Sequence, residues 1–212
     1  MSSVAVIDYG MGNLHSIAKA LQHANPDARV AVTQNPASIL AADRVVFPGV
    51  GALADCMGHL TARGLLPVIR EAAATRPLLG ICLGMQALLT ASEENGGTPA
   101  LGLFEGAVVR FQSGLRLPQG AVRKIPHMGW NRVHPSRPHP LFEGIEPGSW
   151  FYFVHSYYAE PLKSCDIGAT THYPEPFASA LIRNNLAAVQ FHPEKSQEAG
   201  LRLLRNFLAW VP

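Results

Sequence analysis

A strand, a tight turn and a helix are predicted in succession around Cys82, and this pattern constrains the fold more than any other part of the sequence. Residues 77–81 (PLLGI) favour a buried strand, and Gly80 and Gly84 stand on either side of the cysteine. These glycines permit strained backbone angles and a close approach of neighbouring strands. Residues 85–89 then favour a helix. This order predicts a nucleophile elbow, a turn that presents a reactive side chain at the end of a sheet strand.

Cys82 is the candidate nucleophile of this elbow. A sulfur atom at the start of a helix faces unpaired N–H groups and the positive end of the helix dipole, which favour the thiolate. A buried cysteine that carries out no reaction is the alternative interpretation, and the elbow alone does not exclude it.

Composition and charge narrow the class of protein. The 212 residues are 48% hydrophobic and 15% charged, which excludes a disordered chain and favours one α/β domain over residues 1–212. The net charge of +2 and the lack of a long apolar run predict neither a nucleic-acid nor a membrane partner. The N-terminal residues do not resemble a signal peptide. Cys56, Cys82 and Cys165 are too scattered for a disulfide or metal pattern, so we expect a cytoplasmic protein without a bound metal.

The first half of the chain alternates strand-like and helix-like segments. Strands are predicted at residues 4–8, 28–32, 44–47 and 77–81. Asn13 is a suitable N-cap for the first intervening helix. Strands separated by helices form parallel sheets. The turns after Asp8, Phe47 and Ile81 should therefore meet at one edge, where the sites of such sheets gather.

The second half is richer in short strands. They are predicted at residues 107–111, 122–125, 150–154, 167–171, 179–182 and 187–191. Because no helix separates most of them, we expect an antiparallel or mixed extension of the sheet. The loop at residues 134–140 contains too many prolines for regular structure. A final amphipathic helix is predicted to begin near Ser196.

A cysteine nucleophile needs a base, and the base needs a group that orients it. His192 follows a predicted strand, and Glu194 stands two residues later, close enough to accept a hydrogen bond from the imidazole. A surface histidine and glutamate in a loop are the alternative. His155 is a second candidate base, but no carboxylate stands at short spacing from it.

An oxyanion hole is also required. The turn at residues 48–51 (PGVG) ends a strand next to the elbow and exposes backbone N–H groups, and the N–H of Leu83 is a natural second donor. An ordinary tight turn is the alternative. The Gly10-Met11-Gly12 segment lacks the third glycine of a dinucleotide site, so no such cofactor is expected.

Two of these motifs together, residues 80–86 (GICLGMQ) and 191–194 (FHPE), resemble the class I glutamine amidotransferases. Three further segments, residues 8–13 (DYGMGN), 48–51 (PGVG) and 124–131 (KIPHMGWN), resemble one branch of that family, the glutaminase subunits of imidazole glycerol phosphate synthase. The resemblance spans nearly the whole chain. It implies a mostly parallel central sheet flanked by helices with an antiparallel extension, and no cofactor.

The resemblance also implies roles for single residues. Cys82 would attack the side-chain amide of glutamine, His192 would protonate the leaving ammonia, and Glu194 would orient His192. The oxyanion would be held by Val50, Gly51 and Leu83. Glutamine would be bound by Gly49, Gln86, Ser156 and Tyr157.

The sequence offers no acceptor for the ammonia, and a freestanding glutaminase would waste glutamine. The resemblance implies a heterodimer with a (β/α)8-barrel cyclase, which would make imidazole glycerol phosphate and aminoimidazole carboxamide ribotide in histidine biosynthesis. The positions that match the interface are Asn13, Met128, Trp130, Tyr152 and Lys195. Core packing is the alternative for Met128 and Trp130. Val50 stands between two glycines and its peptide is free to flip, which predicts low turnover without the partner.

Three alternatives stay open at this point. The glutaminase of pyridoxal phosphate synthase or of anthranilate synthase would keep the cysteine and the histidine, but we expect it to lack the 48–51 and 126–131 segments. A separate cysteine hydrolase or peptidase would need a substrate groove and no partner. A silent binding module is disfavoured by the presence of Cys82, His192 and Glu194 together.

Overall fold

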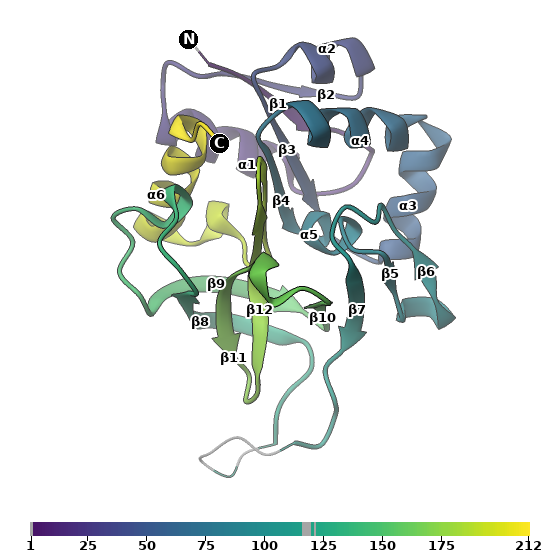
Figure 1. Ribbon diagram of the computed structural model, residues 1–212, viewed down its shortest axis with the longest axis vertical. Helices are drawn as coiled ribbons and strands as arrows, with labels where there is room; N and C mark the ends of the chain where they lie inside the picture. Colours follow the sequence, from purple (N-terminus) through teal and green to yellow (C-terminus); the bar gives the residue numbers. More distant parts are fainter. Residues whose placement is uncertain (1, 116–119, 121) are drawn as a thin grey trace.

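The computed structural model describes residues 2–115, 120 and 122–212. Five parallel strands lie side by side at one end of a mixed sheet (Figure 1). The sheet has 13 strands among the described residues. The order of the parallel strands across the sheet is β2 (Arg29–Thr33), β1 (Ser3–Ile7), β3 (Arg44–Gly49), β4 (Leu78–Cys82) and β13 (Leu186–Val189). Helices connect most of these strands along the chain, so the predicted parallel core is confirmed.

An extension built mainly of antiparallel pairs continues the sheet beyond β13. Its main path is β12 (Pro176–Arg183), β10 (Tyr157–Pro161), β7 (Gly106–Arg110), β5 (Ala91–Ser92) and β6 (Thr98–Pro99). A branch runs from β12 through β11 (Ile167–His172) and β8 (His127–Pro135) to β9 (Ser149–His155). The predicted antiparallel extension is therefore confirmed.

Helices cover both faces of the parallel strands. One apolar cluster contains the buried residues of α1 (Leu14–Ala24) and α6 (Gln197–Ala209). The other cluster includes buried residues of α2 (Pro36–Ala41), α3 (Leu53–Ala62), α4 (Leu65–Thr75) and α5 (Leu83–Ala87). Successive residues of β1 alternate between the clusters, as the pleat of a strand requires. None of the helices that the structure describes has the length and apolar character to cross a membrane.

Two local predictions were wrong, and two elements were missed. Residues 122–125 do not form a strand: Val122 is exposed, whereas the Arg123 side chain is buried and donates to backbone carbonyl groups of Gln112 and Tyr173. The strand begins at His127 instead and continues to Pro135, into the segment predicted to be irregular. Strand β10 and the short helix α2 were not predicted, because both segments are only partly apolar.

The carboxyl ends of the parallel strands position the candidate site. Gly49 of β3 pairs with Cys82 of β4, and His192 lies three residues beyond the end of β13. The predicted N-cap is present as well, since the Asn13 side chain accepts a hydrogen bond from the Ser16 N–H at the start of α1. The turns after β1, β3 and β4 therefore meet at one edge, as predicted.

Candidate active site

The backbone at Cys82 has the strained geometry of a nucleophile elbow. Its φ of 54° and ψ of −109° are unusual for a residue with a side chain, and α5 begins at the next residue. Gly84 makes the turn possible, because a Cβ atom there would lie 1.9 Å from the Phe47 carbonyl oxygen. The close approach of α5 to β3 thus requires glycine and fixes where the Cys82 sulfur points.

His192 and Glu194 form a buried pair beside Cys82. The His192 Nδ1 atom lies 2.8 Å from a Glu194 carboxylate oxygen, and the two side chains are 3% and 5% exposed. The His192 N–H donates to the Tyr152 carbonyl at 2.9 Å, which ties the turn to β9. Gly200 lets α6 pack against this turn, since a Cβ atom there would lie 1.9 Å from the Pro193 carbonyl oxygen.

The surroundings of His192 favour its protonated form. Burial opposes the positive charge, but hydrogen bonding and Coulombic attraction to Cys82 and Glu194 outweigh it and raise the pKa of His192 to about 10. An imidazolium next to a sulfur atom favours a thiolate–imidazolium pair. Such a pair holds both the nucleophile and the proton that a leaving group needs.

A cavity of about 170 Å³ opens on the Cys82 sulfur. Its lining residues are Val50, Gly51, Cys82, Leu83, Gln86, Glu94, Val154, His155, Tyr157 and His192. The structure therefore brings together the candidate nucleophile, the candidate base and all three residues predicted to hold an oxyanion. Of the predicted glutamine-binding residues, Gln86 and Tyr157 line the cavity. Gly49 lines a smaller neighbouring cavity, and Ser156 lines neither.

Two residues of the site were not predicted from the sequence. Gln190 is fully buried, and its amide nitrogen donates toward the Cys82 sulfur at 3.7 Å. As a polar residue in the otherwise apolar run at residues 186–191, two residues before His192, it carried a signal that could have identified it. Glu94 also lines the cavity, and one of its carboxylate oxygens accepts from the Leu53 N–H at 2.7 Å. No sequence pattern pointed to Glu94, because it lies in a short 3-10 turn (Glu94–Gly96) that only the tertiary structure brings here.

His155 is less suited than His192 to act as the base. Its Nδ1 atom lies 2.8 Å from the Tyr157 carbonyl oxygen, and its Nε2 atom lies 2.9 Å from Nδ1 of His127. Both ring nitrogens are thus already engaged. Burial lowers the pKa of His155 to about 3, with further contributions from His127 and His192.

The predicted partner-facing residues lie beside the catalytic edge. Asn13 and Lys195 line a cavity of about 20 Å³ together with His192 and Glu194. The Lys195 ammonium lies 5.6 Å from the centre of the Tyr152 ring, and the Trp130 ring packs edge-on against Tyr152. Trp130 is 44% exposed and Met128, on the same strand, is 62% exposed. Core packing is therefore excluded for both.

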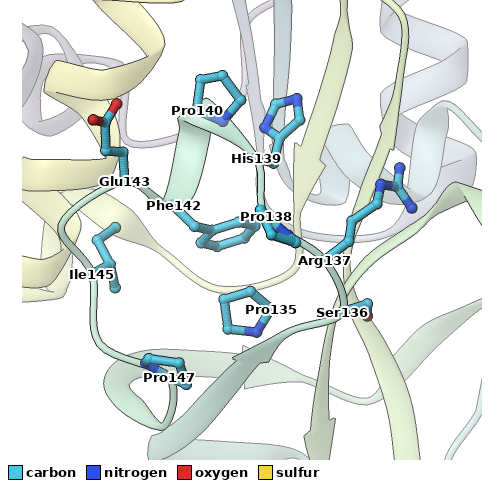
Figure 2. A pocket seen from close by; sticks show the side chains of 10 residues that line it. All are labelled: Pro135, Ser136, Arg137, Pro138, His139, Pro140, Phe142, Glu143, Ile145 and Pro147. Atoms are coloured by element: carbon cyan, nitrogen blue, oxygen red, sulfur yellow. The ribbon is translucent and has the colours of Figure 1, made fainter.

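A larger hollow of about 690 Å³ lies elsewhere, among the prolines that follow β8 (Figure 2). The Arg137 side chain points away from it, and its guanidinium donates to the carbonyls of Cys165, Ile167 and Ile182. His139 accepts a hydrogen bond from the Leu141 N–H. Arg137 and His139 thus stabilise the loop. The smaller cavity is lined by both Cys82 and His192, so it is the candidate active site.

This combination of fold and site defines a class of enzymes. The sequence model described as "Glutamine amidotransferase class-I" matches residues 5–210. Solved structures agree on the fold: a glutamine amidotransferase superimposes with a TM-score of 0.72 at 18% identity and 97% coverage of both chains. The structure of PurLQS from Thermotoga maritima superimposes with a TM-score of 0.71 at 16% identity and 99% coverage of both chains. The chain belongs to the class I glutamine amidotransferases.

Curated relatives place it more closely within that class. Imidazole glycerol phosphate synthase subunit HisH of Methylococcus capsulatus is 68% identical over 213 residues, covering 100% of this chain and 98% of the relative. The HisH subunits of Nitrosococcus oceani and Acinetobacter baylyi are 56% and 54% identical, with at least 98% of each chain covered. Within its class, this chain is a member of the HisH family.

Proposed function

We propose that this chain hydrolyses L-glutamine to glutamate and ammonia. The observation that carries the proposal is that Cys82, at a strained elbow, and His192 line one cavity, while Glu194 lies 2.8 Å from the other side of the His192 ring. A thiolate, an imidazolium and an orienting carboxylate are the groups that amide hydrolysis through a covalent intermediate requires. The curated relatives, named as HisH subunits, support the same assignment.

The reaction proceeds in two halves. The Cys82 thiolate attacks the side-chain amide carbon of glutamine, and the His192 imidazolium transfers its proton to the amide nitrogen as ammonia leaves. A γ-glutamyl thioester remains on Cys82. His192, now neutral, takes a proton from water, and the hydroxide releases glutamate and restores the thiolate–imidazolium pair. Glu194 holds the imidazole ring in place throughout.

The developing oxyanion is held by backbone N–H groups. Leu83 follows the nucleophile at the start of α5, and Val50 and Gly51 face the same cavity from the end of β3. The position of Glu94 suits the substrate's positively charged α-amino group, because its carboxylate lines the cavity on the side of α3.

Four further residues bind the rest of the substrate in this proposal. Gln86 stands one helical turn beyond Cys82, and its amide nitrogen is held by the carbonyl oxygens of Tyr157 and Gln190 at 2.9 and 3.0 Å. Tyr157 and the preceding Ser156 contact the α-carboxylate through their backbone. Gly49 lies behind the oxyanion groups, where a Cβ atom would lie 2.9 Å from Leu83 Cβ.

The ammonia is transferred to a second subunit, a cyclase with a (β/α)8 barrel. The cyclase incorporates it to form imidazole glycerol phosphate and aminoimidazole carboxamide ribotide in histidine biosynthesis. The names of the relatives, each a subunit of a synthase, support a heterodimer. Exposed apolar side chains at the catalytic edge, above all Met128 and Trp130, support docking there. Residues 1–212 would act as one domain, in the cytoplasm, where the Cys82 thiol stays reduced.

Glutamate release from glutamine tests the reaction. We expect slow release by the isolated chain, a large rise when the cyclase and its nucleotide ligand are added, and no release by Cys82→Ala. Cys165→Ala is the matched control, because Cys165 is exposed and lies outside the site. Equal turnover with and without the partner would contradict the regulatory part of the proposal, and activity of Cys82→Ala would contradict all of it.

Partner docking is tested separately by the affinity for the cyclase. Trp130→Ala and Met128→Ala should each raise the dissociation constant by about tenfold or more, because buried aromatic and Met anchors dominate interface energies. Leu162→Ala is the control, since Leu162 is 77% exposed and directly follows β10. An effect of Leu162→Ala equal to that of Trp130→Ala would count against docking at the catalytic edge.

A further inference from the structure

A chain of hydrogen bonds runs from strand β8 to the candidate active site through two buried histidines. The Asn131 amide nitrogen lies 3.1 Å from Nε2 of His127, and Nδ1 of His127 lies 2.9 Å from Nε2 of His155. Nδ1 of His155 then lies 2.8 Å from the Tyr157 carbonyl oxygen. His127 and His155 are directly paired across β8 and β9 and are 3% and 6% exposed.

The two ends of this chain fix the direction of every bond in it. The Tyr157 carbonyl only accepts, so Nδ1 of His155 carries a proton. At the other end, the Asn131 amide nitrogen also faces the His172 carbonyl at 3.0 Å, and its oxygen accepts from the Arg132 N–H at 2.8 Å. The amide orientation is therefore determined, and Nε2 of His127 accepts. Both neutral histidines are thus Nδ1–H tautomers.

One additional proton anywhere in the chain would place two donors face to face. If either imidazole were protonated, Nε2 of His127 would meet the Asn131 NH₂ group as a donor, or the two rings would face each other with N–H groups. The environment agrees with neutral rings, because His127 is stacked on Tyr173 and Phe153, with ring centres 3.9 and 4.8 Å away. Burial lowers the pKa of His127 to about 4.

The chain ends on atoms that hold the substrate site together. The Tyr157 carbonyl that accepts from His155 also accepts from the Gln86 amide, which in turn donates to Gln190. Gln190 donates to the Cys82 sulfur. A shift of the His155 ring would therefore move the shared carbonyl and loosen Gln86.

We propose that His127 and His155 are positioning residues that fix the Tyr157 carbonyl, and through it Gln86, for glutamine binding. This inference rests on the proposed function. It also links the site to the partner-facing strand, because His127 and Asn131 point inward from β8 in alternation with the exposed Met128 and Trp130. A partner that binds Met128 and Trp130 would therefore contact the same strand that positions the chain of hydrogen bonds.

Steady-state glutamine hydrolysis by the complex with the cyclase tests this role. H127F keeps an aromatic ring between Tyr173 and Phe153 but removes both hydrogen bonds, so we expect the KM for glutamine to rise about tenfold, with a smaller change in kcat. H127N restores a donor toward His155 and should recover part of the loss. H134F is the matched control, since His134 is exposed on the same strand and outside the chain.

The bond directions are tested without activity, by ¹⁵N NMR of the histidine rings in the wild-type protein. We expect both rings as neutral Nδ1–H tautomers at neutral pH, and an Nε2–H tautomer or an imidazolium at either position would overturn the proposal. If H127F does not fold, N131L removes the same donor to His127 at a half-buried position and should raise the KM about threefold.

The kinetic outcomes separate this inference from the proposed function. A wild-type complex that releases no glutamate would overturn the proposed function and this inference with it. Normal wild-type turnover with an unchanged KM in H127F and N131L would overturn the inference alone.

Discussion

The side-chain amide of Gln190 links the Cys82 sulfur to the substrate-binding side of the cavity. Its nitrogen donates toward the sulfur at 3.7 Å, and its oxygen accepts from the Gln86 amide at 3.0 Å. Because Gln190 is fully buried, its two polar ends have no water to replace these partners. One buried side chain thus orients the nucleophile and a predicted glutamine-binding residue together.

Replacing Gln190 with Leu should lower kcat by about tenfold or more, because the thiolate loses a buried N–H donor. Gln190→Glu should lower kcat further, since a carboxylate beside the sulfur repels the thiolate. The rate of thioester formation in a single turnover measures both effects. A Gln190→Glu variant that is faster than Gln190→Leu would contradict a role for the N–H group.

Removal of the charge on Glu194 should slow the reaction and lower the pKa of His192. Glu194→Gln keeps an oxygen that accepts from Nδ1 but loses the Coulombic attraction that favours the imidazolium. We expect kcat to fall about a thousandfold, by analogy with other orienting carboxylates. NMR titration of His192 reports the pKa, and Glu198→Gln, at an exposed position in the next helix, is the control of equal charge.

The glycine at position 84 is required by the close approach of α5 to β3. Gly84→Ala places a methyl group 1.9 Å from the Phe47 carbonyl oxygen, and we expect it to destabilise the fold by about 3 kcal/mol or more. Gly58→Ala, an exposed position within α3 with open space around it, should instead stabilise by about 0.5–1 kcal/mol. Urea unfolding compares the two, and equal effects would argue against the close approach.

Acid should destabilise the fold through the two neutral histidines. Burial lowers the pKa of His127 to about 4 and of His155 to about 3, from an ordinary 6.5. The two neutral histidines therefore contribute fully to the free energy of unfolding above pH 6.5. This contribution is lost as the pH falls from 6.5 toward the lowered pKa values, because the unfolded chain binds the protons more readily. The free energy of unfolding should fall by at most about 1.4 kcal/mol per pH unit for each histidine.

Urea unfolding between about pH 7 and about pH 5 measures this loss. H127F removes one of the two groups and should show a shallower slope than the wild type. A slope that is the same in H127F and in the wild type would show that other groups cause the acid sensitivity.

Much of the architecture could be predicted because local patterns carry it. Alternating strand-like and helix-like segments predicted the parallel core, and the glycines around Cys82 predicted the elbow. Local pattern failed at residues 122–125, where the buried Arg123 side chain satisfies distant carbonyl groups and the ladder starts later, at His127. Where β8 begins depends on its pairing with strands that are far away in sequence.

Short stretches of sequence were enough to predict the chemistry of the individual groups: a thiol in a turn that exposes it, and a histidine with a carboxylate two residues away. These features are local, because they depend on backbone geometry and short spacing. The rest of the site depends on how the chain folds in three dimensions. It brought Glu94 and Gln190 to Cys82 and joined His127 to His155. Such contacts link residues from separate strands and loops, and hydrogen-bond direction is fixed only when both ends of a chain are in place.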